Sequence, residues 1–353
     1  MPVTALPTGT PTLLQTEPVG WQRALARAIR DPFELARRLA LPESWAVQAQ
    51  EASRDFPLFV TEEFVERIEI GNPNDPLLRQ VLPLADEMQT VPGFVSDPVG
   101  DLDAQSASGV LHKYQGRALL ITTGACAVHC RYCFRRHFPY SEQPSSQDEW
   151  TPALEYLRQD TTISEVILSG GDPLTIVDSK LAWLVDQLSD IPHIRRLRIH
   201  TRLPIFLPQR ICDAMLNWFT STRLAKWIVL HANHARELDG QVADAIKKLR
   251  GAGAFLFNQS VLLAGINDNA QTLFELSERL IDMGVVPYYL HQLDPVQGAA
   301  HFQVSVERGR ELITELESRL PGYAVPRYVA EYAGRPSKTG LMNRSSNLEI
   351  VDL

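Results

Sequence analysis

The sequence predicts an α/β fold built on a parallel sheet, and two observations lead to that prediction. From Arg117 onward, short apolar runs alternate with amphipathic segments of helical spacing. After the first run they recur roughly every 30 residues, the length of a strand, a helix and two loops. The sheet is therefore expected to be either open and doubly wound or curled into a partial barrel. Both arrangements place the active site at the carboxyl ends of the strands.

Six apolar runs are the candidate parallel strands, because a continuous hydrophobic character is typical of strands that are covered on both faces. They span residues 117–122, 164–170, 195–201, 226–232, 254–263 and 285–292. Amphipathic segments fill the gaps between these runs. The clearest of them span residues 181–189, 242–253 and 273–284.

The regions on either side of the six runs differ from the middle. Up to about residue 110 the pattern predicts helices and proline-broken loops, with helical spacing at 21–29, 31–39, 61–68 and 75–89. After the strands, one more helix is predicted over 306–320, and the tail is expected to cover the mouth of the site. We therefore expect an N-terminal helical region (1–110), a sheet domain (111–297) and a C-terminal covering segment (298–353).

Composition narrows the class of protein. The chain has 353 residues, 44% of them hydrophobic and 22% charged, which is enough to bury a full core. A net charge of -8, with no basic block beyond Arg131, Arg135 and Arg136, argues against nucleic acid as a direct partner. The sequence has neither a signal-peptide pattern nor an apolar run of about 18 residues. A cytoplasmic protein without a membrane span is expected.

Three of the four cysteines, Cys126, Cys130 and Cys133, lie within eight residues directly after the first strand. Such clustering points away from secreted disulfides. A loop at this position could wrap three thiolates around an iron–sulfur cluster and leave one iron without a protein ligand. Zinc is the main alternative, with His129 or His137 completing a ligand set. A loop without metal is disfavoured because clustered exposed thiols oxidise readily.

Two further segments have an interpretation of their own. Cys212 lies in a stretch with apolar neighbours at helical spacing, which predicts a buried structural thiol. At the end of the second strand, the pair Gly170 and Gly171 in SGGDPL would let backbone polar groups approach a ligand closely. Taken alone, that glycine pair is also compatible with an ordinary turn.

With these motifs on one chain, the sequence resembles the radical S-adenosylmethionine superfamily, whose signature is CxxxCxxC at the opening of a βα barrel. The resemblance implies a partial (β/α)6 barrel, a 4Fe-4S cluster on the three cysteines, and S-adenosylmethionine chelating the open iron. Cleavage of its sulfonium then yields a 5'-deoxyadenosyl radical. The SGGDPL segment resembles the glycine-rich segment that contacts the methionine amino group in that family, through Ser169, Gly170, Gly171 and Asp172.

Within that superfamily the sequence resembles the lysine 2,3-aminomutases over nearly its whole length. The stretch CRYCFRRHFPY and the missing C-terminal extension favour the shorter branch that makes β-lysine for elongation factor P. The segments that carry the resemblance are 111–140, 165–174, 198–211, 231–237, 258–268, 287–302 and 335–341.

The resemblance implies pyridoxal phosphate as a second cofactor. Lys338 in RPSKTGL matches the lysine that holds it as a Schiff base, although an arbitrary loop lysine is usually solvated. Tyr114 and Arg117, just upstream of the cysteines, match positions that contact the pyridoxal ring and phosphate. An arginine suits a bidentate phosphate contact, although a surface arginine at a strand start is the alternative.

The resemblance also implies binding residues for the substrate and for S-adenosylmethionine. Arg135 matches the arginine that binds the lysine carboxylate, and a guanidinium fork fits that group well. Asp294 and Glu331 match two aspartates that bind the distal ammonium, and the added methylene of Glu331 is expected to shift that site. Two carboxylates would repel a glutamate side chain. Three further residues match positions around S-adenosylmethionine: His231, Asn233 and Gln259.

The predicted function is therefore an isomerase that converts L-lysine to β-lysine, takes electrons from an external donor, and is linked to elongation factor P through a separate ligase. A homo-oligomer is compatible with the sequence. One alternative is an aminomutase that acts on ornithine or glutamate, and competing substrates in one assay would distinguish it. Another is a non-catalytic iron–sulfur or zinc module, which predicts no covalent pyridoxal phosphate on Lys338.

Overall fold

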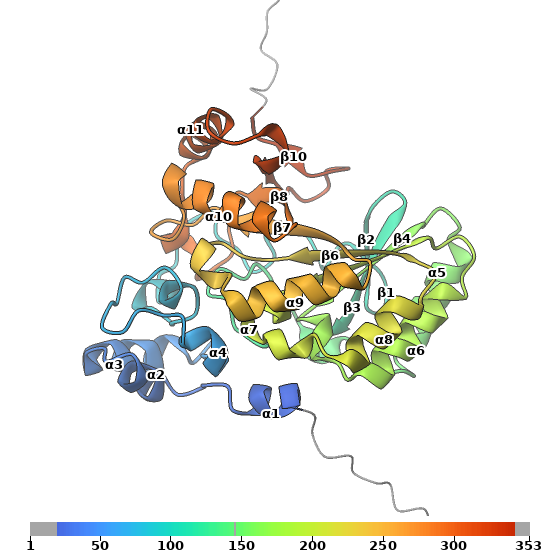
Figure 1. Ribbon diagram of the computed structural model, residues 1–353, viewed down its shortest axis with the longest axis horizontal. Coiled ribbons are helices and arrows are strands. Elements are labelled where there is room, and N and C mark those ends of the chain that lie inside the picture. The colour runs from blue at the N-terminus through green and yellow to red at the C-terminus, as the bar shows by residue number, and fades with distance from the viewer. Residues whose placement is uncertain (1–19, 145, 343–353) are drawn as a thin grey trace, which may run out of the picture.

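The computed structural model describes residues 20–144 and 146–342. Within these ranges one ten-stranded sheet follows the chain order from β1 to β10 (Figure 1). Strands β3 to β9 pair in parallel, whereas β1, β2 and β10 pair antiparallel with their neighbours. The strands span Gln105–Ala107, Val110–Tyr114, Arg117–Thr123, Glu165–Gly170, Arg196–Thr201, Ala225–Leu230, Phe255–Val261, Val286–His291, Arg327–Ala330 and Thr339–Gly340.

All six predicted parallel strands are confirmed, as β3 to β8. The inner side chains of β3 to β9 line one common cavity, so the sheet curls into the predicted partial barrel. Strands β1, β2, β9 and β10 were not predicted. They are short, and β9 lacks a long apolar run, so the sequence carries little strand signal there. The sheet thus extends beyond residues 111–297 at both ends.

Helices cover the outside of the sheet, and α1 to α4 form a separate helical region before the first strand (Figure 1). In the N-terminal region, α3 was not predicted. The helix expected over 75–89 is wrong: the structure has two short 3-10 turns there, because Pro83 interrupts a helix at that point. No helix in residues 20–144 and 146–342 is long and apolar enough to cross a membrane. Helices α1 to α11 span Gly20–Ala26, Pro32–Arg38, Glu43–Ala52, Glu62–Val65, Thr151–Gln159, Asp178–Ser189, Leu203–Phe206, Asp213–Ser221, Gly240–Gly251, Ala270–Asp282 and Val306–Glu317.

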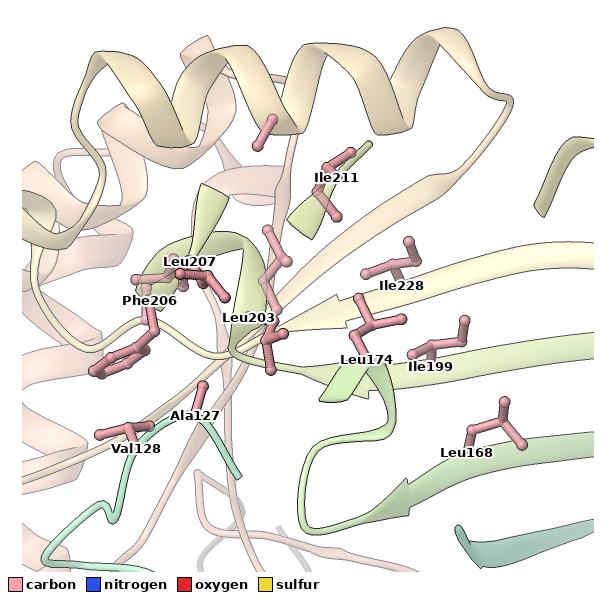
Figure 2. Close-up of a cluster of buried hydrophobic side chains, with 14 of the residues drawn as sticks. Ala127, Val128, Leu168, Leu174, Ile199, Leu203, Phe206, Leu207, Ile211 and Ile228 are labelled. Atoms are coloured by element: carbon pink, nitrogen blue, oxygen red, sulfur yellow. The ribbon is translucent and has the colours of Figure 1, made fainter. Parts of the chain in front are cut away.

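The strands alternate between a buried outer face and a polar inner face. On β5, Leu197 and Ile199 are fully buried under the helices, whereas Arg198 and His200 point into the cavity. Figure 2 shows the outer core, where Ile199 lies among leucine and isoleucine side chains of neighbouring strands and crossovers. Burying one such side chain stabilises the fold by about 1.5–3 kcal/mol. This core leaves the inner face free to carry polar groups.

The cysteine loop is fixed to this core from one side. Ala127 and Val128, between the first two cysteines, are buried and lie near Phe206 of α7 (Figure 2). From the other side, Gly171 N donates to Thr123 O at 2.7 Å. A Cβ atom at Gly171 would collide with the carbonyl oxygen of Ala125, so this close approach requires glycine.

Candidate active site

A single cavity of about 820 Å³ runs along the inside of the barrel. The cysteine loop borders it at the carboxyl ends of the strands, and Arg117 and Arg196 border it at the amino ends. Lys338, which precedes β10, also lines it. Every predicted site residue except Asn233 lines this cavity. The fold therefore brings together residues that are more than 200 positions apart in the sequence.

The three cysteines of the loop are free thiols that line the cavity together. Burial, followed by the nearby thiol of Cys133, raises the pKa of Cys126, and burial raises the pKa of Cys133 to about 11. Crowded thiols of this kind ionise when a cation binds them. In the described ranges no three His, Cys, Asp or Glu side chains converge on one metal ion. A four-iron cluster binds each thiolate through a different iron, so this donor set fits it.

The two histidines considered for a zinc set make other contacts. His129 donates from Nδ1 to Pro57 O at 2.8 Å and stacks on Phe56 with ring centroids 4.8 Å apart. His137 donates from Nε2 to Gln297 O at 3.1 Å. Each imidazole thus binds a different segment of the chain, which disfavours a shared zinc site with the cysteines.

The SGGDPL segment lies against the cysteine loop. Gly170 has a φ of +114°, and the amide of Asp172 donates to Ala125 O at 2.7 Å. The Asp172 carboxylate accepts hydrogen bonds from Thr201 Oγ1 and from the Arg202 amide, both at 2.7 Å. These donors bind the Asp172 carboxylate within the protein, and its expected contact with S-adenosylmethionine stays a prediction. The Asp172 carboxylate thus joins the ends of β4 and β5.

Asn233 lies behind the cavity wall rather than in it. It is fully buried, and its Nδ2 donates to Gln80 Oε1 at 3.0 Å and to Tyr132 Oη at 2.6 Å. Its Oδ1 accepts from the Val261 amide at 2.8 Å. Each of these polar atoms has a partner within the protein, and the expected contact of Asn233 with a cofactor stays a prediction. His231 and Gln259 do line the cavity.

Five side chains form a row of alternating charges along one wall of the cavity, which we call the charge row. Lys338 donates from Nζ to Glu331, and Lys113 Nζ lies 3.1 Å from the other oxygen of that carboxylate. Lys113 also lies 2.5 Å from Asp101 Oδ1, and Arg135 Nε donates to Asp101 Oδ2 at 2.6 Å. The sequence analysis missed both Lys113 and Asp101. Lys113 lies in the segment 111–140 but was given no role there, and Asp101 lies outside every segment that carries the resemblance.

The row shifts the pKa of its acids. Burial alone would raise the pKa of Glu331, but Lys338 and Lys113 outweigh it and hold the pKa at about 2. For Asp101 as well, the cations Arg135 and Lys113 outweigh burial and lower the pKa. Both carboxylates are therefore ionised at neutral pH. Asp294 differs, because burial dominates and raises its pKa to about 7.

Comparison with known proteins identifies the chain. Residues 120–276 match the family model described as the Radical SAM superfamily. The L-lysine 2,3-aminomutase of Escherichia coli (strain K12) is 50% identical over 91% of this chain and 94% of that protein. That of Haemophilus influenzae is 46% identical over 93% and 98%. That of Clostridium subterminale is 32% identical over 91% of this chain and 77% of that protein. The chain belongs to the L-lysine 2,3-aminomutase family.

Membership in this family makes the protein a radical S-adenosylmethionine isomerase that moves an amino group within one molecule. The family implies a 4Fe-4S cluster and S-adenosylmethionine. Residues of the cysteine loop fit the cluster by their chemistry, as described above.

Deeper in the barrel of this family member, Tyr114 and Arg117 stand at the two ends of a tight β2–β3 turn. Gly116 in that turn has a φ of +78°, and the Arg117 guanidinium carbon lies 4.5 Å from the centroid of the Tyr114 ring. Burial, followed by the carboxylate of Glu331, raises the pKa of Tyr114. The predicted ring and phosphate contacts thus lie next to the charge row.

Two histidines of the inner wall have buried nitrogens without partners. Nε2 of His200 on β5 and Nε2 of His291 on β8 have no hydrogen-bond partner among the residues that the structure describes. Burial lowers the pKa of both imidazoles, so they are neutral at physiological pH. Unpaired buried polar atoms are costly, which indicates room for a polar ligand beside them. Sequence analysis missed both, although their inward positions near strand ends are a usable signal.

Proposed function

We propose that the protein converts L-lysine to β-lysine and that Lys338 binds pyridoxal phosphate covalently. One observation carries this proposal: an amine, Lys338, lies in the same cavity as a cysteine cluster, with a charge row leading to Arg135. The unpaired imidazoles of His200 and His291 line the same cavity and support a polar ligand there. Arg117 is the residue we assign to the phosphate, since a guanidinium suits a bidentate phosphate contact.

The two ends of lysine match opposite charges on the cavity wall. We assign the substrate carboxylate to Arg135, whose NH1 also donates to Ser169 Oγ at 3.3 Å. We assign the distal ammonium to Asp294 and Glu331, both of which line the cavity. The Glu331 carboxylate is already bound by two lysines, so Asp294 supplies the uncompensated charge. An arriving ammonium would favour ionised Asp294.

The residues of this chain bind, orient and shield the substrate. When bound, S-adenosylmethionine supplies the radical that takes hydrogen from Cβ, and pyridoxal phosphate supplies the conjugated system over which the amino group moves. Arg135 orients Cα, and Asp294 fixes the far end of the side chain. Glu331 accepts a hydrogen bond from Nζ of Lys338 and holds this amine in position. The barrel walls keep water from the radical.

The direct test is anaerobic reconstitution with iron, sulfide, S-adenosylmethionine, pyridoxal phosphate and a reductant, followed by chiral analysis of the product. Supplying equal L-lysine, L-ornithine and L-glutamate in one vessel tests the substrate. Glu331 favours ornithine as the second candidate, because a longer carboxylate arm reaches a shorter substrate. We expect β-lysine to be the main product. A product made chiefly from ornithine would overturn the assignment to lysine.

We further propose that the β-lysine made here is attached to elongation factor P by a separate ligase. The support is the resemblance of residues 130–140 to the branch of the family that serves this factor. Expressing the protein in a bacterium that lacks its own aminomutase should restore the mass of β-lysylated factor P. A variant with all three loop cysteines changed to alanine is the matched control. An unmodified factor beside measurable β-lysine would contradict this destination.

A further inference from the structure

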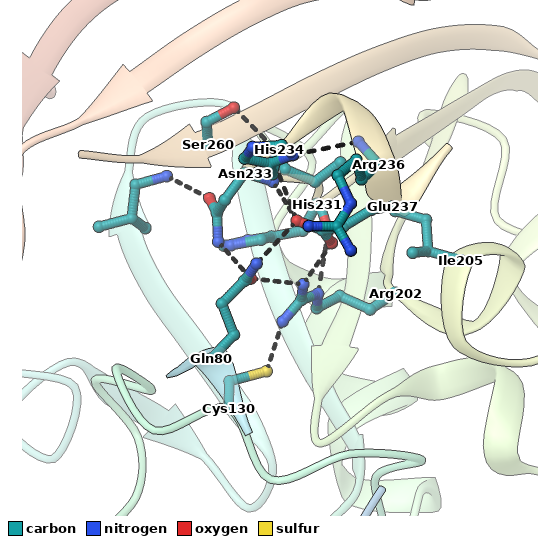
Figure 3. Close-up of polar contacts among 12 residues, drawn as sticks. Gln80, Cys130, Arg202, Ile205, His231, Asn233, His234, Arg236, Glu237 and Ser260 are labelled. Atoms are coloured by element: carbon teal, nitrogen blue, oxygen red, sulfur yellow. Dashed lines mark hydrogen bonds and ion pairs between the residues drawn. The ribbon is translucent and has the colours of Figure 1, made fainter. Parts of the chain in front are cut away.

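Arg202 is a buried cation in direct contact with the cysteine loop. Its NH1 donates to Cys130 Sγ at 2.8 Å (Figure 3). The same nitrogen donates to Tyr132 Oη at 2.7 Å. Its Nε donates to His231 O at 2.9 Å, and its NH2 donates to Glu237 Oε2 at 2.8 Å. The residue is 8% exposed. One guanidinium therefore joins a predicted cluster ligand to the protein interior.

The fold fixes Arg202 from its backbone. It follows directly after β5, at the carboxyl end of the parallel strands, and precedes α7. The Asp172 carboxylate accepts hydrogen bonds from the amides of Arg202 at 2.7 Å and Leu203 at 3.1 Å. Asp172 thus acts through Arg202, and this explains why its own carboxylate is occupied within the protein.

The far side of the guanidinium is held as firmly. The carboxylate of Glu237, which is fully buried, also accepts from Gln80 Nε2 at 3.0 Å and from the Asn233 amide at 2.8 Å. Gln80 Oε1 in turn accepts from Arg202 NH2 at 3.2 Å. The Arg202 guanidinium faces the Cys130 thiol, and the Glu237 carboxylate lies behind the guanidinium (Figure 3).

We propose that Arg202 is a positioning residue that sets the reduction potential of the cluster bound to the cysteine loop. Reduction adds one negative charge to a cluster, and hydrogen bonds to its sulfur atoms stabilise the more negative state. A buried site strengthens this interaction because the surroundings screen it weakly. Glu237 opposes the effect from a greater distance. Arg202 therefore raises the potential, and Glu237 tempers the increase.

The experiment measures the potential itself. Wild-type protein, Arg202→Gln, Arg202→Lys and Glu237→Gln are reconstituted anaerobically and titrated by electron paramagnetic resonance without any lysine. At a fixed poise, Arg202→Gln should lower the ratio of reduced to oxidised cluster about tenfold, which equals about 59 mV for one electron. Glu237→Gln should raise the ratio, because it leaves the cation uncompensated. Arg202→Lys keeps the charge and should restore part of the loss.

The matched control is Arg210→Gln. Arg210 is also fully buried and paired with a carboxylate, Asp178 at 2.8 Å, but it does not line the cavity. The reduction potential of the cluster in Arg210→Gln should equal that of the wild type. Iron and sulfide content and far-ultraviolet circular dichroism verify that each variant holds a cluster and folds.

Opposite shifts for Arg202→Gln and Glu237→Gln support the proposal. An unchanged potential in Arg202→Gln overturns it, and so does a downward shift in both variants, which would indicate general loosening of the site. If Arg202→Gln does not hold a cluster, Glu237→Gln decides, and a potential at or below that of the wild type overturns the proposal. The titration involves no lysine turnover, so it is separate from the test of the proposed reaction.

Discussion

At the scale of single residues, the site depends on where charges are compensated and where they are not. Lys338 and Glu331 face each other at the loop end of the β9–β10 hairpin, next to the pair formed by Thr339 and Ala330. Lys113 takes the other side of the Glu331 carboxylate. Among the residues that the structure describes, no cation forms an ion pair with Asp294, and its raised pKa follows from burial. The two acids assigned to one ammonium therefore have different electrostatic states before the substrate arrives.

The first prediction concerns Lys338. Lys338→Ala should remove the visible absorption band of bound pyridoxal phosphate and lower turnover on the order of a thousandfold or more, because the covalent attachment is lost. The iron content should not change, since Lys338 and the cysteines lie on separate segments. Lys247→Ala, at an exposed lysine of α9, is the control and should keep both the absorption band and the turnover. A retained absorption band in Lys338→Ala would contradict the assignment.

The second prediction concerns Asp294 and pH. With a pKa of about 7 in the free enzyme, the carboxyl is neutral below that value and ionised above it. The affinity for a cationic substrate should therefore fall as the pH is lowered, by about tenfold per pH unit below the pKa. The KM for lysine measured from pH 6 to 8.5 tests this. Asp294→Asn should have a higher KM without this slope, and a slope that persists would assign the titration to another group.

At the scale of elements, the sequence predicted the six parallel strands and most crossover helices, because continuous apolar runs and helical spacing are strong local signals. It did not predict β9 and β10. Strand β9 pairs with β8 and β10 pairs with β9, so both depend on a neighbouring strand rather than on their own composition, as tertiary context often decides for short strands. The site residues likewise divide into those with a local sequence signal and those that only the fold brings together. Motif residues were found, whereas Lys113 and Arg202 were missed because only the fold brings them to the cavity.

The third prediction tests the contact between the SGGDPL segment and the cysteine loop. Gly171→Ala would drive a Cβ atom into Ala125, so the two segments must separate. We expect a loss of about 1–3 kcal/mol in stability and a lower iron content per chain. Gly240→Ala, at the start of α9 with open space around it, is the matched control and should change neither. Full iron content in Gly171→Ala would show that the loop tolerates the displacement.

At the scale of the whole molecule, the charge row joins the two edges of the parallel sheet. Lys113 lies on β2, before the parallel strands begin, and Glu331 and Lys338 belong to the β9–β10 hairpin that follows them. Asp101 and Arg135 extend the row to the cysteine loop. Buried ion pairs are costly to break once one partner is lost. The charge row therefore couples the contact between β2 and the β9–β10 hairpin, which closes the barrel, to the ionisation of the site residues.

The fourth prediction uses the acid sensitivity of this closure. The pKa of Glu331 is about 2 in the folded protein, below its ordinary value of 4.5, so the ionised form stabilises the fold. That contribution to stability is fully present well above pH 4.5, and it is lost as the pH falls from 4.5 toward the folded-state pKa of about 2. By linkage, about 1 kcal/mol should be lost between pH 7 and pH 4. The Glu331→Gln variant has no carboxyl group at this position that could titrate, so its free energy of unfolding should fall less between pH 7 and pH 4.

Urea unfolding of the apoprotein at both pH values measures this difference in the free energy of unfolding. Glu307→Gln, at an exposed carboxylate of α11, serves as the control and should follow the wild type. Because Glu331 pairs with Lys113 across the barrel, the acid-sensitive part of the stability should become smaller in Lys113→Met, which removes one of the two cations that hold the pKa low. An equal acid loss in all four proteins would separate the charge row from closure of the barrel and leave it a role in the site alone.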